Sequence, residues 1–328
     1  MQKLICSIYL RRLIFITILI CQNHNLFSQD TNSDINSDYN YYWQLNDKEL
    51  RLPEYKDTDE ALKIKLSQLD IINRSRRKFR AAPVRLDILA SRVANKMCRE
   101  AAENKYVSHW NLAGEKPYHR YAFAGGYDHV SENAFGEWDS GSYEKSGLLI
   151  SQMMKEGHGT FMSERAPNDG HKKNIIEKEH NFVGIGYFMT DDQFRYYEEF
   201  IDRYLEFEKI PSELKTNEQS SITVKTNGTN YLYFLIVYRD KFVQPQKVSQ
   251  LSRTGSYEDY SNEEYLKIPA WDLTRYRMES TYKIPLKFTK EGLYYIHIFL
   301  DKKENTGSSA LNTKGKAPVS GIVIRVIR

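Results

Sequence analysis

Cysteine is scarce in this chain: only Cys6, Cys21 and Cys98 occur among 328 residues. Long apolar stretches are lacking as well, because the run at residues 13–20 spans about eight residues where a bilayer-crossing helix needs about twenty. The formal net charge is only +4. Neither the His-Glu-x-x-His helix of metalloproteases nor the Gly-x-Ser-x-Gly elbow of α/β-hydrolases is present. The apolar run is therefore too short to span a bilayer, and the chain carries neither of these two hydrolase signatures.

Residues 1–28 have the pattern of a secretion signal, with Lys3, Arg11 and Arg12 ahead of or beside the apolar run and small or polar residues after it. A retained N-terminal anchor is the alternative, and Cys21 raises the alternative of lipidation. Removing this segment takes away three cations and no acid, so the net charge falls from +4 to +1. We therefore predict a secreted, cell-surface or periplasmic protein without a nucleic-acid partner.

Signal removal also leaves Cys98 as the last cysteine, and a lone cysteine cannot form an internal disulfide. An exported chain without disulfides depends on its hydrophobic cores, which favours a bacterial product over an animal or plant one. Cys98 itself lies on an apolar helical stripe, where a buried structural thiol is expected rather than a nucleophile.

Hydrophobic spacing divides the remainder. Residues 29–59 are polar and aperiodic, which predicts a flexible leader. Helical periods over residues 60–80 and 86–101, followed by β-rich segments near residues 182–188 and 195–200, predict a mixed domain over residues 60–210. Gly184 and Gly186 in the first of these strands allow close backbone approach.

From residue 212 onward, β-branched and aromatic runs alternate with turn residues, which predicts a small all-β sandwich over residues 212–328. The Asn227-Gly228 pair predicts a hairpin between two of its strands. The predicted fold class is α+β.

Several compact motifs occur in the mixed domain in a characteristic order. They are Ile71-Ile72-Asn73-Arg74, Val107-Ser108-His109, Ser131-Glu132-Asn133-Ala134, Gly170-His171-Lys172-Lys173-Asn174-Ile175-Ile176 and Val183-Gly184-Ile185-Gly186-Tyr187. In this order and spacing they resemble the CAP superfamily, the group of cysteine-rich secretory proteins, antigen 5 and pathogenesis-related 1 proteins, also called the SCP domain. The disulfide-free bacterial branch is the most similar.

The resemblance implies an α-β-α sandwich and a cleft lined by two histidines and two glutamates. The matching positions are His109, Glu132, Glu156 and His171. Glu156 matches least well, because Met153 stands where many eukaryotic members have tryptophan, and Glu164 lies in the same region. Either Glu156 or Glu164 is therefore the expected fourth cleft residue.

Two imidazoles and two carboxylates suit zinc or another divalent cation, with His109 and His171 as the ligands. An open coordination position would also permit hydrolysis, with Glu132 as the candidate general base. The same four side chains could instead form an architectural hydrogen-bond network. The other histidines of the domain, at 119, 129, 158 and 180, are expected in solvated loops, although His129 and His158 lie close to Glu132 and Glu156 in sequence and could join a site.

We therefore predict an extracellular binding or recognition module whose ligand is a lipid, a carbohydrate or a protein. A metal-dependent, peptidase-like hydrolase and a purely structural cell-surface protein are the alternatives. The sequence favours the non-enzymatic interpretation.

Overall fold

The computed structural model describes residues 38–251, 257, 263–305, 307, 312, 316 and 318–328. The predicted signal peptide at residues 1–28 and Cys21 lie outside these residues. Residues 49–328 form one compact unit, and residues 38–48 belong to a separate one. The latter are helical, and Pro53–Tyr55 form a 3-10 helix (η1), so the leader contains regular structure that its aperiodic sequence did not predict. Among the described residues, no helix has both the length and the apolar character needed to cross a bilayer.

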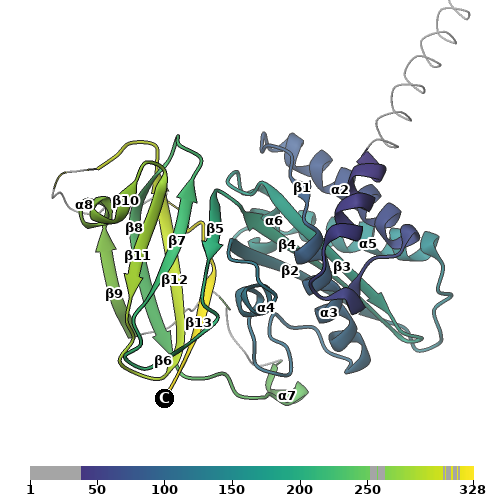
Figure 1. Ribbon diagram of the computed structural model, residues 1–328. Coiled ribbons are helices and arrows are strands. Elements are labelled where there is room, and N and C mark those ends of the chain that lie inside the picture. The colour runs from purple at the N-terminus through teal and green to yellow at the C-terminus, as the bar shows by residue number, and fades with distance from the viewer. Residues whose placement is uncertain are drawn as a thin grey trace, which may run out of the picture. The chain divides into compact units, whose positions relative to one another are not determined.

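The first sheet has the strand order β1-β3-β4-β2 and is antiparallel except for the β1–β3 pair (Figure 1). Its strands are β1 (Arg85–Leu86), β2 (His129–Trp138), β3 (Phe182–Met189) and β4 (Gln193–Asp202). The helices of this part of the chain are α2 (Asp59–Lys78), α3 (Ile88–Glu103), α4 (Pro117–Phe123), α5 (Gly147–Ser163) and α6 (Gly170–Ile176).

Helix α3 packs on one face of this sheet at very short range. Its N-cap is Asp87, whose carboxylate accepts a 2.6 Å hydrogen bond from Ala90 N, and its buried stripe carries small residues. A Cβ on Gly184 would lie 2.4 Å from Ala90 Cβ, and a Cβ on Gly186 would lie 2.4 Å from the Ala94 carbonyl carbon. The predicted close approach at these glycines is therefore confirmed.

The opposite face of the sheet is covered by α2 and α5. Gln68 of α2 donates a 2.8 Å hydrogen bond to the Tyr196 hydroxyl, and Phe161 of α5 stacks on the same tyrosine. Since successive residues of a strand point to opposite faces, Tyr196 and Glu198 face α2 and α5, whereas Tyr197 and Glu199 face α3. The predicted α-β-α sandwich is thus present.

The remaining strands form two further sheets, with orders β10-β11-β7-β5 and β6-β13-β12-β8-β9. Their bounds are β5 (Leu205–Lys209), β6 (Glu213–Lys215), β7 (Ser220–Thr226), β8 (Tyr231–Asp240), β9 (Glu263–Pro269), β10 (Arg277–Met278), β11 (Thr281–Leu286), β12 (Gly292–Asp301) and β13 (Ile322–Ile327). Short helices α7 (Val248–Leu251), α8 (Ala270–Leu273) and η2 (Thr274–Tyr276) connect them. A shared apolar core lies between these two sheets.

The structure corrects one detail of the β region. The predicted hairpin at Asn227-Gly228 is wrong, because β7 and β8 belong to different sheets and the turn carries the chain from one to the other. In addition, β5 pairs with β7 although its residues fall inside the predicted 60–210 segment. The change of sheet occurs between Asp202 and Leu205, and the boundary at 210–212 between domains remains a prediction.

Candidate functional site

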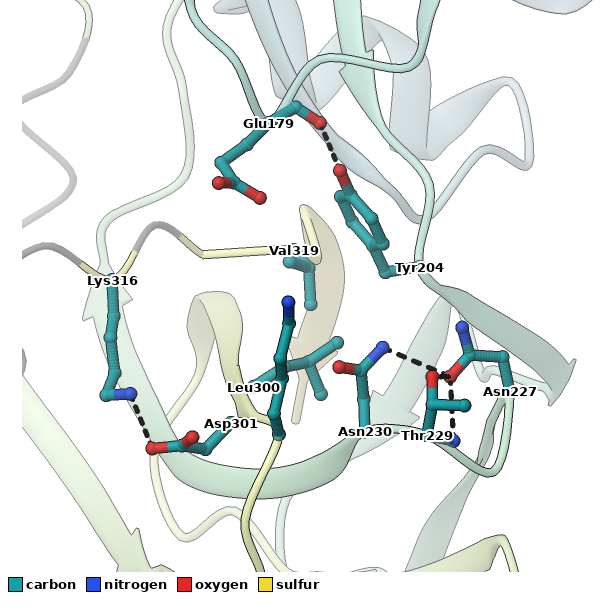
Figure 2. Close-up of a pocket in the computed structure, with 10 residues that line it drawn as sticks. Glu179, Tyr204, Asn227, Thr229, Asn230, Leu300, Asp301, Lys316 and Val319 are labelled. Carbon is teal, nitrogen blue, oxygen red and sulfur yellow. Dashed lines mark hydrogen bonds and ion pairs between the residues drawn. The ribbon is translucent and has the colours of Figure 1, made fainter. Parts of the chain in front are cut away.

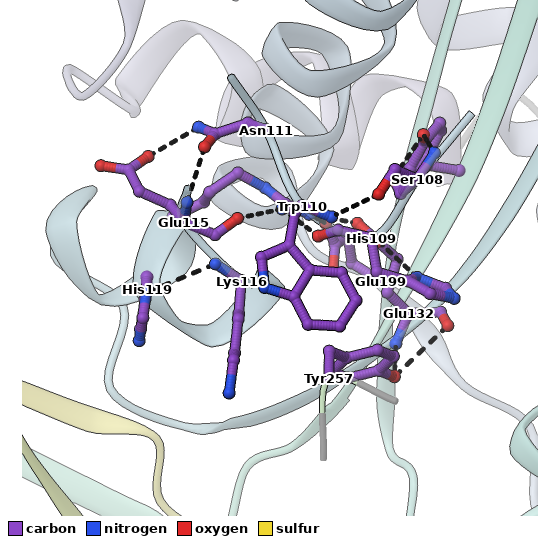
Figure 3. Close-up of polar contacts among 12 residues, drawn as sticks. Ser108, His109, Trp110, Asn111, Glu115, Lys116, His119, Glu132, Glu199 and Tyr257 are labelled. Carbon is purple, nitrogen blue, oxygen red and sulfur yellow. Dashed lines mark hydrogen bonds and ion pairs between the residues drawn. The ribbon is translucent and has the colours of Figure 1, made fainter. Parts of the chain in front are cut away.

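The site lies beside β2, at an edge of the first sheet, where the segment after α3 meets α4 (Figure 3). Arg120 on α4 anchors that segment by donating through Nη1 to the His109 carbonyl oxygen at 2.7 Å. The same guanidinium contacts the carboxylate of Glu132 through Nη2. His109 is thus fixed at its backbone by the same cation that pairs with Glu132.

Glu132 divides its two carboxylate oxygens between two partners. Oε1 accepts from His109 Nδ1 at 2.8 Å, and Oε2 is the oxygen paired with Arg120. The Glu132 side chain is fully buried, whereas a quarter of the His109 side chain is exposed. Burial raises the pKa of Glu132, and Arg120 opposes that effect. Glu132 therefore holds one nitrogen of an imidazole that is partly exposed.

Glu199 lies directly opposite Glu132 in the β2–β4 register and is equally buried. Arg120 Nη2 is 3.5 Å from its Oε1, and within the described residues neither carboxylate oxygen receives a regular hydrogen bond. Burial, followed by the negative charge of Glu132, raises the pKa of Glu199 well above its ordinary value. The raised pKa favours the protonated form of Glu199, and Arg120 lies within reach of both carboxylates.

Sequence reasoning missed Glu199. Its signal was present in the pair Glu198-Glu199, which interrupts a wholly buried strand that is rich in aromatic residues. Two adjacent acids in a buried strand must each find a polar partner, one on either face.

The second imidazole is His171, at the start of α6. Its Nδ1 lies 2.5 Å from Glu164 Oε1, and its backbone N–H donates to Glu164 Oε2 at 3.0 Å. Phe161 stacks on the ring with centroids 4.7 Å apart. Glu164, rather than Glu156, is therefore the acid that the structure brings to His171.

Glu156 lies on an exposed face of α5, where its Oε1 accepts from the Gln152 side chain at 2.9 Å. The two histidines of the predicted quartet do approach each other. The rings of His109 and His171 have centroids 6.3 Å apart and planes inclined by 36°.

Tyr257 covers part of this site. Its ring lies 4.6 Å from that of His109, and its hydroxyl accepts a 2.7 Å hydrogen bond from Glu132 N (Figure 3). Because its sequence neighbours carry no motif, nothing in the sequence indicated that Tyr257 would reach His109.

Two imidazoles and two carboxylates are groups of the kind that bind divalent cations. With a Zn–N distance of about 2 Å, a tetrahedral angle at the metal places two ring centres about 5 Å apart, so the 6.3 Å separation here corresponds to a wider angle at a shared ion. In each ring the Nδ1 nitrogen is directed at a carboxylate, which is the usual arrangement behind a metal-bound Nε2. Across the residues that the structure describes, however, no group of three or more His, Cys, Asp or Glu side chains is arranged to hold a metal.

The expectation of solvated histidines elsewhere is wrong. His119, His158 and His180 are at most 4% exposed, and His129 shares the carboxylate of Asp202 with His180. Cys98 is buried as expected, and burial raises the pKa of its thiol.

A pocket of about 450 Å³ lies apart from this site, near Tyr204 and the end of β12 (Figure 2). Its polar groups pair with one another: Lys316 Nζ lies 2.6 Å from Asp301, and the Tyr204 hydroxyl donates to the Glu179 carbonyl oxygen at 2.6 Å. Because these groups already have partners within the protein, the pocket is a weaker candidate for a ligand site than the pair of histidines.

No family model matches the chain, and no curated protein matches it. Among solved structures, an extracellular SCP-domain protein from Bacillus anthracis aligns at 18% identity and a TM-score of 0.32, covering 42% of this chain and 40% of that one. An outer surface protein from Borrelia burgdorferi aligns at 15% identity and a TM-score of 0.33, covering 42% of this chain and 93% of that one. A cysteine-rich secretory protein from Staphylococcus aureus aligns at 13% identity and a TM-score of 0.26, covering 42% and 38%.

The TM-scores of these three structures all lie below 0.5. The chain spans less than half the length of the first of them. At such identities and TM-scores the likeness identifies no ligand or reaction.

Proposed function

We propose that this chain is an exported binding protein whose cleft holds a divalent cation between His109 and His171. The strongest support is that the two imidazole rings have the same arrangement of partners. Each has its Nδ1 directed at a carboxylate, Glu132 or Glu164, and the rings lie 6.3 Å apart. A carboxylate at Nδ1 favours the tautomer whose lone pair is on Nε2, which is the nitrogen that a cation needs.

Two imidazoles alone do not make a closed structural zinc site, which has four protein ligands. The proposed site is therefore open, with the remaining positions available to water or to a group of an extracellular ligand. Partial exposure of His109 and His171, at 25% and 34% of their side chains, gives such a ligand access. When bound, the cation would contribute affinity for an oxygen or nitrogen donor of that ligand.

The surroundings of Glu132 favour binding over hydrolysis. A general base must reach the water that it deprotonates, but Glu132 is fully buried and both of its oxygens have partners. Glu132 thus orients His109 and balances Arg120. The alternative of a metal-dependent hydrolase requires this carboxylate to leave two interactions.

Zinc titration of the full chain by calorimetry tests the proposal. We expect about one ion per chain, with affinity reduced at least tenfold in His109→Ala and in His171→Ala. His129→Gln is the matched control, since it removes an imidazole that pairs with Asp202 away from this pair. Zinc binding that persists in the variant carrying both His109→Ala and His171→Ala, or no zinc binding by the wild type, would contradict the proposal. Cleft variants that lose only thermal stability would support the structural alternative, and zinc-dependent ester or peptide cleavage lost in Glu132→Gln would support the hydrolase.

A further inference from the structure

A second polar constellation lies on the other face of the first sheet, between α2, α5 and β4. Ser75 Oγ is 2.9 Å from His158 Nε2, and His158 Nδ1 is 2.8 Å from Glu198 Oε1. The three residues come from separate elements and share no motif in the sequence. A hydroxyl, an imidazole and a carboxylate in this order have the geometry by which a Ser-His-acid triad is recognised.

The hydrogen bonds around Glu198 determine the tautomer of His158. The Tyr196 hydroxyl donates to Oε1 at 2.5 Å, and Asn133 Nδ2 donates to Oε2 at 3.0 Å. A carboxylate with these donors accepts a third proton from His158 Nδ1–H. In the tautomer with a proton on Nδ1, the lone pair of His158 is on Nε2, 2.9 Å from the Ser75 hydroxyl. The imidazole is thereby oriented as a base toward that serine.

Other serines of the helices make the bond that is ordinary in this setting. Ser67 on α2 and Ser151 on α5 donate to the carbonyl oxygen four residues earlier, at 3.0 Å and 2.8 Å. Ser75, on the same helix as Ser67, is bonded to an imidazole instead.

A similar-looking group, Ser131, His180 and Asp202, lacks this polarity. Ser131 Oγ donates to Asn174 Oδ1 at 2.7 Å and lies 3.4 Å from His180 Nε2. The Ser131 hydroxyl proton is therefore directed at an amide oxygen and not at the imidazole. In the Ser75 group, by contrast, the imidazole is the partner of the hydroxyl.

We propose that Ser75, His158 and Glu198 form a serine-type acyl-transfer site that takes small activated carboxylic esters. Ser75 is partly exposed, whereas His158 and Glu198 are buried, so an ester, and afterwards the water that releases the acid, must approach from the side of Ser75. Ser75 Oγ forms a bond to the acyl carbon as its proton passes to His158 Nε2. The ester C–O bond breaks, and the leaving alkoxide takes that proton. Water then repeats the sequence and releases the carboxylic acid.

The position of Ser75 inside α2 limits the rate. Backbone N–H groups within a helix are already bonded, so the turn that carries Ser75 supplies no oxyanion donor. Loss of one such donor costs about 100- to 1,000-fold in characterised enzymes. We therefore expect the site to react with activated acyl or phosphonyl groups and to turn over slowly.

A fluorophosphonate probe tests this on the full chain, because attack by Ser75 Oγ displaces fluoride and leaves a stable adduct. Intact-mass and peptide spectrometry should show one adduct per chain on Ser75. Ser75→Ala should abolish it, Ser67→Ala should leave it unchanged, and Glu198→Gln should slow its formation by about 100-fold. No adduct, an adduct on another residue, or an unchanged rate in Glu198→Gln would overturn the proposal.

Glu198 is buried, so its substitution could act through folding. Ser75→Cys supplies a second readout in the same background. If His158 acts as a base, iodoacetamide alkylation of the new thiol should fall by about tenfold or more on adding Glu198→Gln, with the circular-dichroism melt used to select a temperature at which both variants are folded. Equal alkylation rates in the two folded proteins would show that the hydrogen bonds are only structural.

Discussion

Replacing Glu199 by glutamine should remove a pH dependence of stability. Glu199 is buried opposite Glu132, and burial together with that charge raises its pKa well above the ordinary range. An unfolded glutamate releases its proton near pH 4.3. Between that pH and the folded-state pKa, the native chain binds one more proton than the unfolded chain does. The stability from this proton is therefore fully present below about pH 4.3 and is lost as pH rises.

The size of the effect follows from proton linkage. One extra proton in the native state lowers the free energy of unfolding by about 1.4 kcal/mol for each pH unit gained. Within the window, the wild type should therefore lose stability through Glu199 as pH rises. A glutamine at this position does not titrate, and its amide still offers a donor to Glu132. The variant should therefore be the more stable protein at neutral pH.

Urea unfolding, followed by tryptophan fluorescence between pH 4.5 and 8, measures this difference. The gap between Glu199→Gln and the wild type should widen in favour of the variant as pH rises. Glu156→Gln is the matched control, since it removes an exposed carboxylate from α5. Parallel curves for Glu199→Gln and the wild type would refute the assignment of a retained proton to Glu199.

Two further predictions concern buried positions. Burial lowers the pKa of His119 to about 3, so between that value and about pH 6.5 the unfolded chain binds one more proton at this residue than the native chain does. His119→Gln should therefore reduce the loss of stability, measured by urea unfolding, as the pH falls through this window, and equal acid sensitivity in both proteins would contradict this. Gly184→Ala should cost about 1–3 kcal/mol by thermal melting, because its Cβ would lie 2.4 Å from Ala90 Cβ, whereas Gly159→Ala, with no atom within 4 Å, should be neutral or stabilising; similar melting temperatures for the two would contradict close packing at Gly184.

Local patterns predicted the layers of this fold well. The small-residue stripe of α3 and the glycines of β3 indicated a close helix–sheet contact, and both lie at that contact. They succeed because each reports a constraint within a few residues, namely the space that a backbone needs. The turn at Asn227-Gly228 has the same local character, but its sequence does not say which strands will pair. The hairpin prediction failed for that reason.

The four residues predicted for the candidate site show the same contrast between local and long-range information. His109 and Glu132 were expected to lie together, and His109 Nδ1 is 2.8 Å from Glu132 Oε1. The position of Glu156 was harder to predict, because the face of α5 on which it lies depends on how the helix is rotated about its axis. That helix ends at Ser163, and the chain then turns so that the next residue, Glu164, accepts the backbone N–H of His171. Glu199 could not be inferred from one strand alone, since its partner is set by the register between β2 and β4.

One amide connects the two networks that flank the sheet. Asn133 follows Glu132 on β2 and therefore points to the opposite face, where its Nδ2 donates to Glu198 Oε2 at 3.0 Å and to the His171 carbonyl oxygen at 3.2 Å. Its Oδ1 accepts from Asn174 at 2.9 Å, which ties α6 to the strand. The same side chain thus orients the acid behind His158 and holds the helix that carries His171. Neither Glu132 nor Glu199 reaches that face, so the connection between His171 and the Ser75 group runs through Asn133 and through Phe161, which stacks on both His171 and Tyr196.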